Sequence, residues 1–215
     1  MAVHGRQTLR DLFDDSPTPH IAHPPRTHHR HFYVATDGSY RPDGGGLGAV
    51  IEARDGTRVA RVSLPDTPPD NNVAEYRALH LGLDVLAARA PPDALVGVLV
   101  DHDDLAGNVN SAVLETRQPG WHPGRSSSVP AGSELHWRGI QARIAGFGEL
   151  RAARIDSRDN PAHPLANTPA EYAHVNRQPD RCVLPCDRIG REVDTAEPQF
   201  PPPSRFDRAG GASSD

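Results

Sequence analysis

Lysine is absent from this 215-residue chain, whose 23 basic residues are all arginine, and the formal net charge is −5. General basicity therefore does not hold the protein on nucleic acid, and any affinity for a polyanion has to come from local arginines or from bound metal. Aromatic residues are also scarce, at 5% of the chain, whereas proline and glycine number 22 and 19. This composition predicts one folded core with flexible ends and long loops.

Cysteine is limited to Cys182 and Cys186, which form a single C-x-x-x-C. Two cysteines exclude a disulfide scaffold and are typical of an intracellular protein. Even with His174 they fall short of the four ligands of a structural zinc site, so free thiols are the favoured interpretation. No apolar run is long enough to cross a bilayer, and the N-terminus lacks the hydrophobic region of a signal peptide. We therefore expect a soluble, cytoplasmic protein.

What the chain does contain is a short apolar run ending on a carboxylate, in HFYVATDGSYRPDGGGLG at residues 31–48. Aromatic and β-branched residues predict a strand at 32–37, and the glycines that follow predict a hairpin into further strands at 47–54 and 57–64. Asp37 ends the first strand. A carboxylate on a half-buried strand is costly unless it is paired, hydrogen-bonded or metal-bound. The alternative is that Asp37 only bonds the backbone of the turn.

Two more carboxylates occur at comparable places. Residues 70–86 have helical apolar spacing, with Asp70, Asn71 and Asn72 as candidate caps. Glu75 is expected in the first turn of this helix. The apolar run at 94–100 predicts a buried parallel strand and ends on Asp101. Carboxylates at neighbouring strand ends and a helix start converge on one point, and they repel one another unless a divalent cation lies among them. Singly, Glu75 is also explained by the helix dipole and Asp101 by capping of the next helix.

Four segments in this order, TDGSY, NNVAEYRAL, VLVDHDDL and RDNPAHPLAN, resemble type 1 ribonuclease H over about residues 32–175. The resemblance implies an α/β fold, ribonuclease H-like, with a mixed five-stranded sheet flanked by helices. A helix predicted at 135–147 and a strand at 150–156 agree with it. It further implies endonucleolytic hydrolysis of the RNA strand of RNA–DNA hybrids with two metal ions, Mg²⁺ or Mn²⁺.

The resemblance also assigns the metal ligands. Asp37 would bridge both ions, and Glu75 and Asp101 would hold the ion beside the leaving group. His163 stands where the family has its fourth carboxylate. Imidazole is a poor ligand for Mg²⁺ and a better one for Mn²⁺, so His163 shifts the metal preference, acts as an acid or base, or marks weakened catalysis. Asp159 lies near enough in sequence to replace it. The alternative function is a nucleic-acid-binding module that keeps the ribonuclease H fold but has weakened or lost catalysis through His163.

Further polar positions are expected to contact the hybrid. By resemblance the matching asparagines contact the hybrid backbone, where the RNA 2′-hydroxyl distinguishes RNA from DNA. The expected substrate-binding residues are Gly38, Ser39, Asn71, Asn72 and Asn160. Asn71 and Asn72 are alternatively helix caps, and Asn160 is alternatively a cap or a residue that supports the site.

The N-terminal residues 1–31 are expected to form a flexible tail. Within it, Arg6 to Phe13 is similar to the sliding-clamp-binding peptide of replication and repair proteins, although Arg6 and Leu12 depart from that pattern. The alternative is a helical turn that packs on the protein's own core. Five histidines between residues 20 and 31 match no closed metal site and favour a solvated linker.

Two other segments are rich in proline, glycine and serine. Residues 116–132 predict a loop, in which Trp121 and Arg125 either contact a nucleic-acid strand or fold back on the core. Residues 176–215 predict a largely disordered C-terminal tail. The folded domain is thus expected at 32–175.

Overall fold

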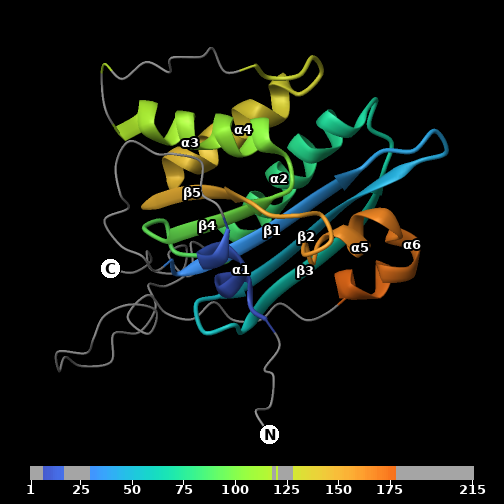
Figure 1. Ribbon diagram of the computed structural model, residues 1–215, viewed down its shortest axis with the longest axis horizontal. Coiled ribbons are helices and arrows are strands. Elements are labelled where there is room, and N and C mark those ends of the chain that lie inside the picture. Colours follow the sequence, from blue (N-terminus) through green and yellow to red (C-terminus); the bar gives the residue numbers. More distant parts are fainter. Residues whose placement is uncertain (1–6, 17–29, 118–119, 121–127, 178–215) are drawn as a thin grey trace, which may run out of the picture.

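The protein was analysed as a computed structural model, which describes residues 7–16, 30–117, 120 and 128–177. These residues form a sheet with helices on both sides (Figure 1). The elements in chain order are α1 (Leu9–Asp15), β1 (Phe32–Ser39), β2 (Gly45–Ala53), β3 (Arg58–Asp66), α2 (Asn71–Ala87), β4 (Leu95–Val100), α3 (Asp103–Arg117), α4 (Glu134–Gly146), β5 (Glu149–Arg154), α5 (His163–Asn167), α6 (Pro169–Tyr172) and the 3₁₀ helix η1 (Ala173–Arg177).

The sheet has the strand order β3-β2-β1-β4-β5. The hairpins predicted after Asp37 make β1, β2 and β3 antiparallel, whereas β4 lies parallel to both β1 and β5. Parallel neighbours need long crossover connections, and helices α2, α3 and α4 supply them. The predicted mixed five-stranded α/β sheet is confirmed, with strand boundaries within about two residues of those expected.

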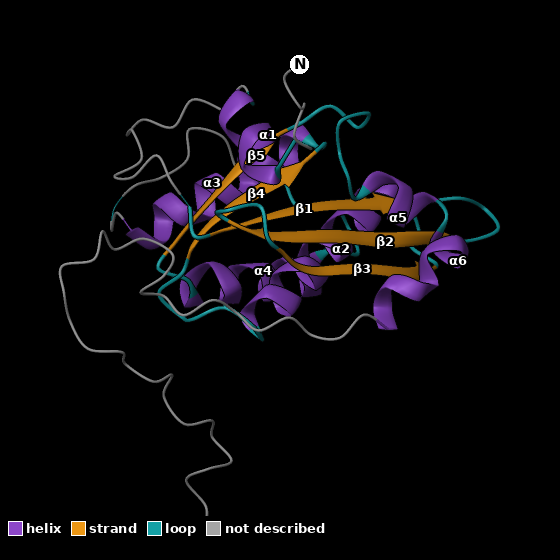
Figure 2. Ribbon diagram, turned by 90° about the horizontal axis from the view of Figure 1, so that it is seen from below, coloured by secondary structure: helices purple, strands orange, loops and turns teal. Residues whose placement is uncertain are grey.

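Each face of the sheet has its own apolar core, because side chains alternate between the two faces along a strand. The larger core joins the sheet to α2, α3 and α4, with Tyr76, Leu105 and Ile140 fully buried. The smaller core, on the other face, includes Tyr33 of β1 and residues of α1 and α5. Figure 2 shows α1 and α4 on opposite sides of the sheet. The central strands of the sheet are therefore packed against helices on both faces.

The expected N-terminal tail contains a helix that packs on the protein itself. Thr8 and Asp11 form a reciprocal capping box at the start of α1. Leu9 is 2% exposed, and the Phe13 ring packs edge-on against Tyr33 with ring centroids 5.5 Å apart. Leu9 and Phe13 of the clamp-like peptide are thus buried in the smaller core, and Leu12 packs against it partly buried. The structure thus shows the alternative stated for this segment, a helical turn that packs on the protein's own core, and binding to a sliding clamp stays a prediction.

Several other predictions fall outside the described residues. They concern His20, His23, His28 and His29 of the linker, Trp121 and Arg125 of the loop, Cys182 and Cys186, and the C-terminal tail from residue 178. Within the described ranges, no helix combines the length and the apolar character needed to cross a membrane.

Candidate metal and nucleic-acid site

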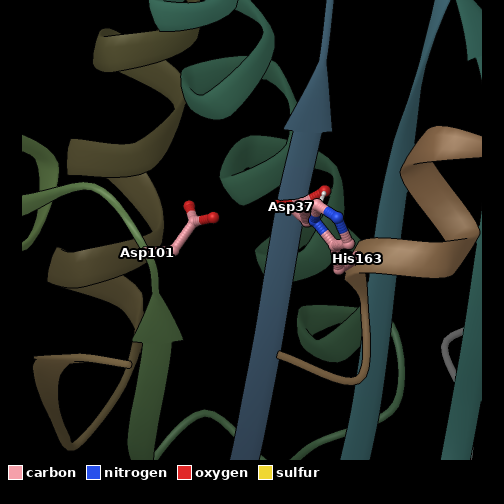
Figure 3. Close-up of side chains that lie close together, drawn as sticks. All are labelled: Asp37, Asp101 and His163. Carbon is pink, nitrogen blue, oxygen red and sulfur yellow. Dashed lines mark ion pairs between the residues drawn. The ribbon is translucent and has the colours of Figure 1, made fainter. Parts of the chain in front are cut away.

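Two aspartates meet because their strands are parallel neighbours. Ala35 of β1 pairs with Leu99 of β4, so two residues further along, Asp37 and Asp101 lie at the same edge and on the same face of the sheet. Asp37 is 2% exposed, and Asp101, directly after β4, is half-buried. Figure 3 shows Asp101 pointing from the end of its strand toward β1. Sequence reasoning predicted this convergence from the two strand ends.

His163 joins the aspartates as the first residue of α5. Its Nδ1 atom lies 3.4 Å from Oδ2 of Asp37, and its side chain is 47% exposed. One ligand atom from each of Asp37, Asp101 and His163 lies within 4.8 Å of the others, and the described residues contain no second group of three or more such side chains (Figure 3). Asp159 is exposed and stands outside this group. Position 163 therefore reaches the site and Asp159 does not.

Glu75 lies beside this group without belonging to it. It lies in the second turn of α2 and not in the first turn as predicted, because Asp70 is the cap and accepts a hydrogen bond from the Val73 N–H at 2.8 Å. Glu75 is 2% exposed and accepts a hydrogen bond from the backbone N–H of Gly38. A Cβ atom at Gly38 would lie 2.2 Å from the carbonyl carbon of Ala74. Only a residue without a side chain lets β1 approach α2 this closely.

Burial and mutual repulsion disfavour the ionised form of the carboxylates at the site. Burial, with a further contribution from Asp101, raises the pKa of Asp37 to about 7, and His163 acts in the opposite direction. Burial also raises the pKa of Glu75 well above its ordinary range, and Asp101 and Asp37 add to this rise. Within the described chain, Oδ2 of Asp37 and Oε2 of Glu75 are buried without a hydrogen-bond partner.

These residues fit a divalent cation. Carboxylate oxygens are the donors that Mg²⁺ and Mn²⁺ prefer, and buried carboxylates that repel one another are stabilised by a positive ion between them. The buried Asp37 oxygen that lacks a hydrogen-bond partner is available as a ligand. The imidazole of His163 adds a nitrogen donor, which Mn²⁺ accepts more readily than Mg²⁺ does. The donor set thus matches the two metals expected from the sequence.

Two residues near the site were missed by sequence reasoning. Ser157 Oγ donates a hydrogen bond of 2.7 Å to Oδ2 of Asp101 and so orients that carboxylate. His102 accepts a hydrogen bond from the Leu105 N–H at its Nδ1 atom, which leaves Nε2 to donate to Oδ1 of Asn72 at 3.0 Å. The only sequence signal was position, since His102 directly follows the predicted ligand Asp101 and Ser157 directly precedes the RDNPAHPLAN segment.

The five expected substrate-binding residues divide into two groups. Asn71 and Asn72, at the start of α2, are exposed. Gly38 is buried against α2. Ser39 is 6% exposed, and its hydroxyl donates to the Ala166 carbonyl and accepts from the Gly46 N–H. Gly38 and Ser39 therefore position β1 against its neighbours, and their expected contact with substrate stays a prediction.

Asn160 is also a supporting residue. It is 3% exposed, its amide donates to the Thr36 carbonyl at 2.9 Å, and its Oδ1 accepts from the Ala162 N–H at 3.0 Å. The Asn160 carbonyl in turn accepts from the His163 N–H. Asn160 therefore ties the start of α5 to β1 and holds His163 beside Asp37, which agrees with the alternative of a site-supporting residue, and its expected contact with substrate stays a prediction.

Several solved structures share this fold. The N-terminal RNase H domain of Rv2228c from Mycobacterium tuberculosis, solved as a maltose-binding-protein fusion, is 25% identical, with 63% of this chain and 95% of that chain covered and a TM-score of 0.50. RNase H1 of the halophilic archaeon Halobacterium salinarum is 21% identical, with 66% and 98% covered and a TM-score of 0.50.

A more distant structure is similar as well. The foamy viral protease-reverse transcriptase in complex with an RNA/DNA hybrid is 18% identical, with 74% of this chain and 23% of that chain covered and a TM-score of 0.51. No protein-family model matches the sequence, and no curated protein matches it. The family resemblance thus depends on the ordered motifs together with the three-dimensional similarity. On both grounds, the chain has the ribonuclease H-like fold of the type 1 ribonucleases H.

Proposed function

We propose that this protein hydrolyses the RNA strand of RNA–DNA hybrids with the help of two divalent metal ions. The observation that carries the proposal is the meeting of Asp37, Asp101 and His163 within 4.8 Å, beside the buried Glu75. The foamy viral structure of the same fold contains an RNA/DNA hybrid, and the RNase H domain of Rv2228c shares a quarter of its aligned residues with this chain.

The residues have distinct roles in this proposal. Asp37, with a buried oxygen that lacks a hydrogen-bond partner, would be shared between the ions, and Glu75 and Asp101 would hold one of them. His163, from α5, would hold the other. Divalent ions at such a site activate water and stabilise the charge that develops on the phosphate and leaving oxygens.

The surrounding side chains orient the ligands and the substrate. Ser157 holds the Asp101 carboxylate through its hydroxyl, and Asn160 holds the start of α5. His102 binds the carbonyl oxygen of the Asn72 side chain, so the Asn72 NH₂ group is left to donate. A donor at this exposed place suits the acceptor oxygens of a sugar or phosphate.

A second function, a hybrid-binding module without catalysis, is favoured by one observation. An imidazole occupies the position from which a fourth carboxylate would bind Mg²⁺. Under this alternative the protein binds the hybrid and cleaves it with neither metal.

The two functions separate in one assay. A labelled RNA–DNA hybrid is incubated with the full chain in Mg²⁺ or in Mn²⁺, and cleavage and binding are measured in parallel. We expect cleavage in both metals, with Mn²⁺ the more effective because of His163. Binding without cleavage in either metal would establish the module instead.

Matched variants identify the site. Asp37→Asn removes the charge at the shared ligand and should abolish cleavage, whereas Asp159→Asn changes an exposed aspartate in the loop before α5 and should leave cleavage unchanged. Cleavage that survives Asp37→Asn would show a contaminating nuclease or a different site. Loss of cleavage in Asp159→Asn would assign the fourth ligand to Asp159.

A further inference from the structure

Two histidines from neighbouring helices face each other away from the carboxylates. Nδ1 of His80, on α2, lies 3.2 Å from Nδ1 of His136, on α4. The ring centroids are 5.5 Å apart and the planes cross at 70°. Only one hydrogen can lie between the two nitrogens, so at least one of these rings presents an unprotonated nitrogen to the other.

The His80 ring has three close neighbours, which are His136, Gly139 and Asp84. It occupies the space where a side chain at position 139 would be, since a Cβ atom on Gly139 would lie 2.0 Å from Nε2 of His80. Asp84, one turn further along α2, places Oδ2 3.5 Å from the same Nε2 atom. Arg143 donates from Nε to Oδ1 of Asp84 at 2.6 Å and fixes that carboxylate.

We propose that His80 and His136 bind one divalent transition-metal ion, best Zn²⁺, through their Nδ1 atoms. Two imidazole nitrogens on a tetrahedral Zn²⁺ at about 2.0–2.1 Å stand roughly 3.3 Å apart, which is close to the separation observed. A small rotation of the two rings converts the shared hydrogen bond into two metal bonds.

The carboxylate on the far side of His80 supports this assignment. Histidines that bind metal usually direct their other ring nitrogen at a carboxylate, a carbonyl or water, which fixes the tautomer and strengthens the ligand. Asp84 stands in that relation to Nε2 of His80. Within the described chain this arrangement is independent of the carboxylate site, because neither histidine belongs to the group around Asp37.

The local charge is compatible with a cation. Arg77 and Arg143 are nearby, but each is paired, Arg77 with Asp66 at 2.8 Å and Arg143 with Asp84. Burial lowers the pKa of His136, and His80 and Arg77 lower it further, which favours the neutral ligand form at neutral pH. The His80 side chain is 25% exposed, so water fills the remaining coordination positions.

The ion would join α4 to α2, the helix that carries Glu75. An ion that binds the folded state alone stabilises it in proportion to its occupancy. We therefore expect Zn²⁺ at a hundredfold excess over its Kd to raise the Tm of the full chain by about 5 °C. Saturating Mg²⁺ is included to compete for the carboxylate site, and any Zn²⁺ bound there is common to wild type and His136→Ala, so it cancels in their comparison.

The test compares four variants by calorimetric Zn²⁺ titration and by the Zn²⁺-dependent change in Tm. His136→Ala should bind one Zn²⁺ ion fewer than the wild type and should lack the Zn²⁺-dependent rise in Tm. His174→Ala is the control, because its exposed histidine hydrogen-bonds only the Glu171 carbonyl in the described structure. It should bind the same number of ions as the wild type and show the same rise in Tm. Asp84→Asn keeps both nitrogens and should weaken binding about tenfold.

Gly139→Ala tests the position of the His80 ring directly. Its Cβ would lie 2.0 Å from Nε2 of His80, so it displaces the ring and should weaken Zn²⁺ binding by at least about tenfold. An equal ion count and Tm increase in wild type, His136→Ala and His174→Ala would overturn the proposal and assign the zinc to the other histidines of the chain.

Discussion

Two kinds of buried carboxylate occur in this protein. Glu52, Asp37 and Glu75 are each 2% exposed. Glu52 has a partner for each oxygen, since Oε2 accepts from the Leu9 N–H at 2.9 Å and Oε1 from Arg58 at 3.1 Å. Asp37 and Glu75 each keep one buried oxygen without a hydrogen-bond partner. Burial alone therefore does not separate the proposed metal ligands from a structural acid such as Glu52, whereas the oxygen without a hydrogen-bond partner does.

The largest expected difference between the two kinds is in activity. Asp37→Asn should slow hybrid cleavage by about a thousandfold or more, which corresponds to several kcal/mol of lost transition-state stabilisation. Glu52→Gln should leave cleavage near the wild-type rate and lower the free energy of unfolding by about 2 kcal/mol, because two charge-assisted hydrogen bonds are weakened. Single-turnover kinetics and urea unfolding of both variants measure this. Equal loss of cleavage in folded Glu52→Gln would remove the distinction.

The pH dependence of stability should sharpen the comparison. In metal-free protein the folded state keeps the Asp37 proton up to about pH 7, whereas the unfolded chain loses it near pH 4. Between these values the folded state binds more protons, so its stability falls as pH rises, by on the order of 2 kcal/mol. Urea unfolding in EDTA across this range should show the slope in the wild type and a flatter slope in Asp37→Asn. A parallel slope in the two proteins would contradict the strained state of Asp37.

Asn160 extends the comparison to a buried amide whose two polar atoms both have partners. Asn160→Ala loses the hydrogen bonds to Thr36 and Ala162 and should cost about 2 kcal/mol of unfolding free energy. Asn160→Asp keeps the acceptor for Ala162 and loses only the donor, so an intermediate cost is expected. Thermal unfolding measures both. A wild-type Tm in Asn160→Ala would show that α5 does not depend on this residue.

The smallest expected effect concerns the metal preference. His163→Asp places a carboxylate beside Asp37 and should raise the Mg²⁺-dependent cleavage rate about tenfold, or about 1.4 kcal/mol, while the ratio of Mn²⁺ to Mg²⁺ rates falls. His163→Ala is the control, because it removes the imidazole without adding an oxygen. An unchanged ratio in His163→Asp would mean that position 163 does not bind either ion.

Much of the fold was predictable because it depends on local patterns. Apolar runs and glycine-rich turns located all five strands, and the capping Asp70 located the start of α2. The convergence of Asp37 and Asp101 followed from their places at the ends of parallel strands. These features are set by residues close together in sequence or by simple sheet geometry.

The remaining features depend on contacts between distant segments. Nothing near Asn160 or Ser39 indicates that their partners are Thr36 and Ala166. The burial of Leu9 likewise required knowledge of Glu52 and the smaller core. The pairing of His80 with His136 depends on how α2 and α4 pack, which no periodicity in either helix specifies.

The contact at Gly38 has a consequence for other chains with the same fold and the same acidic residues. β1 and α2 touch there through their backbones, and Gly38, the residue after Asp37, has no side chain to hold them apart. Any larger residue at that place would move α2 outward and carry Glu75 away from Asp37. A chain that keeps every acidic residue but has a bulkier neighbour after the first should therefore bind a cation poorly, whatever its ligands.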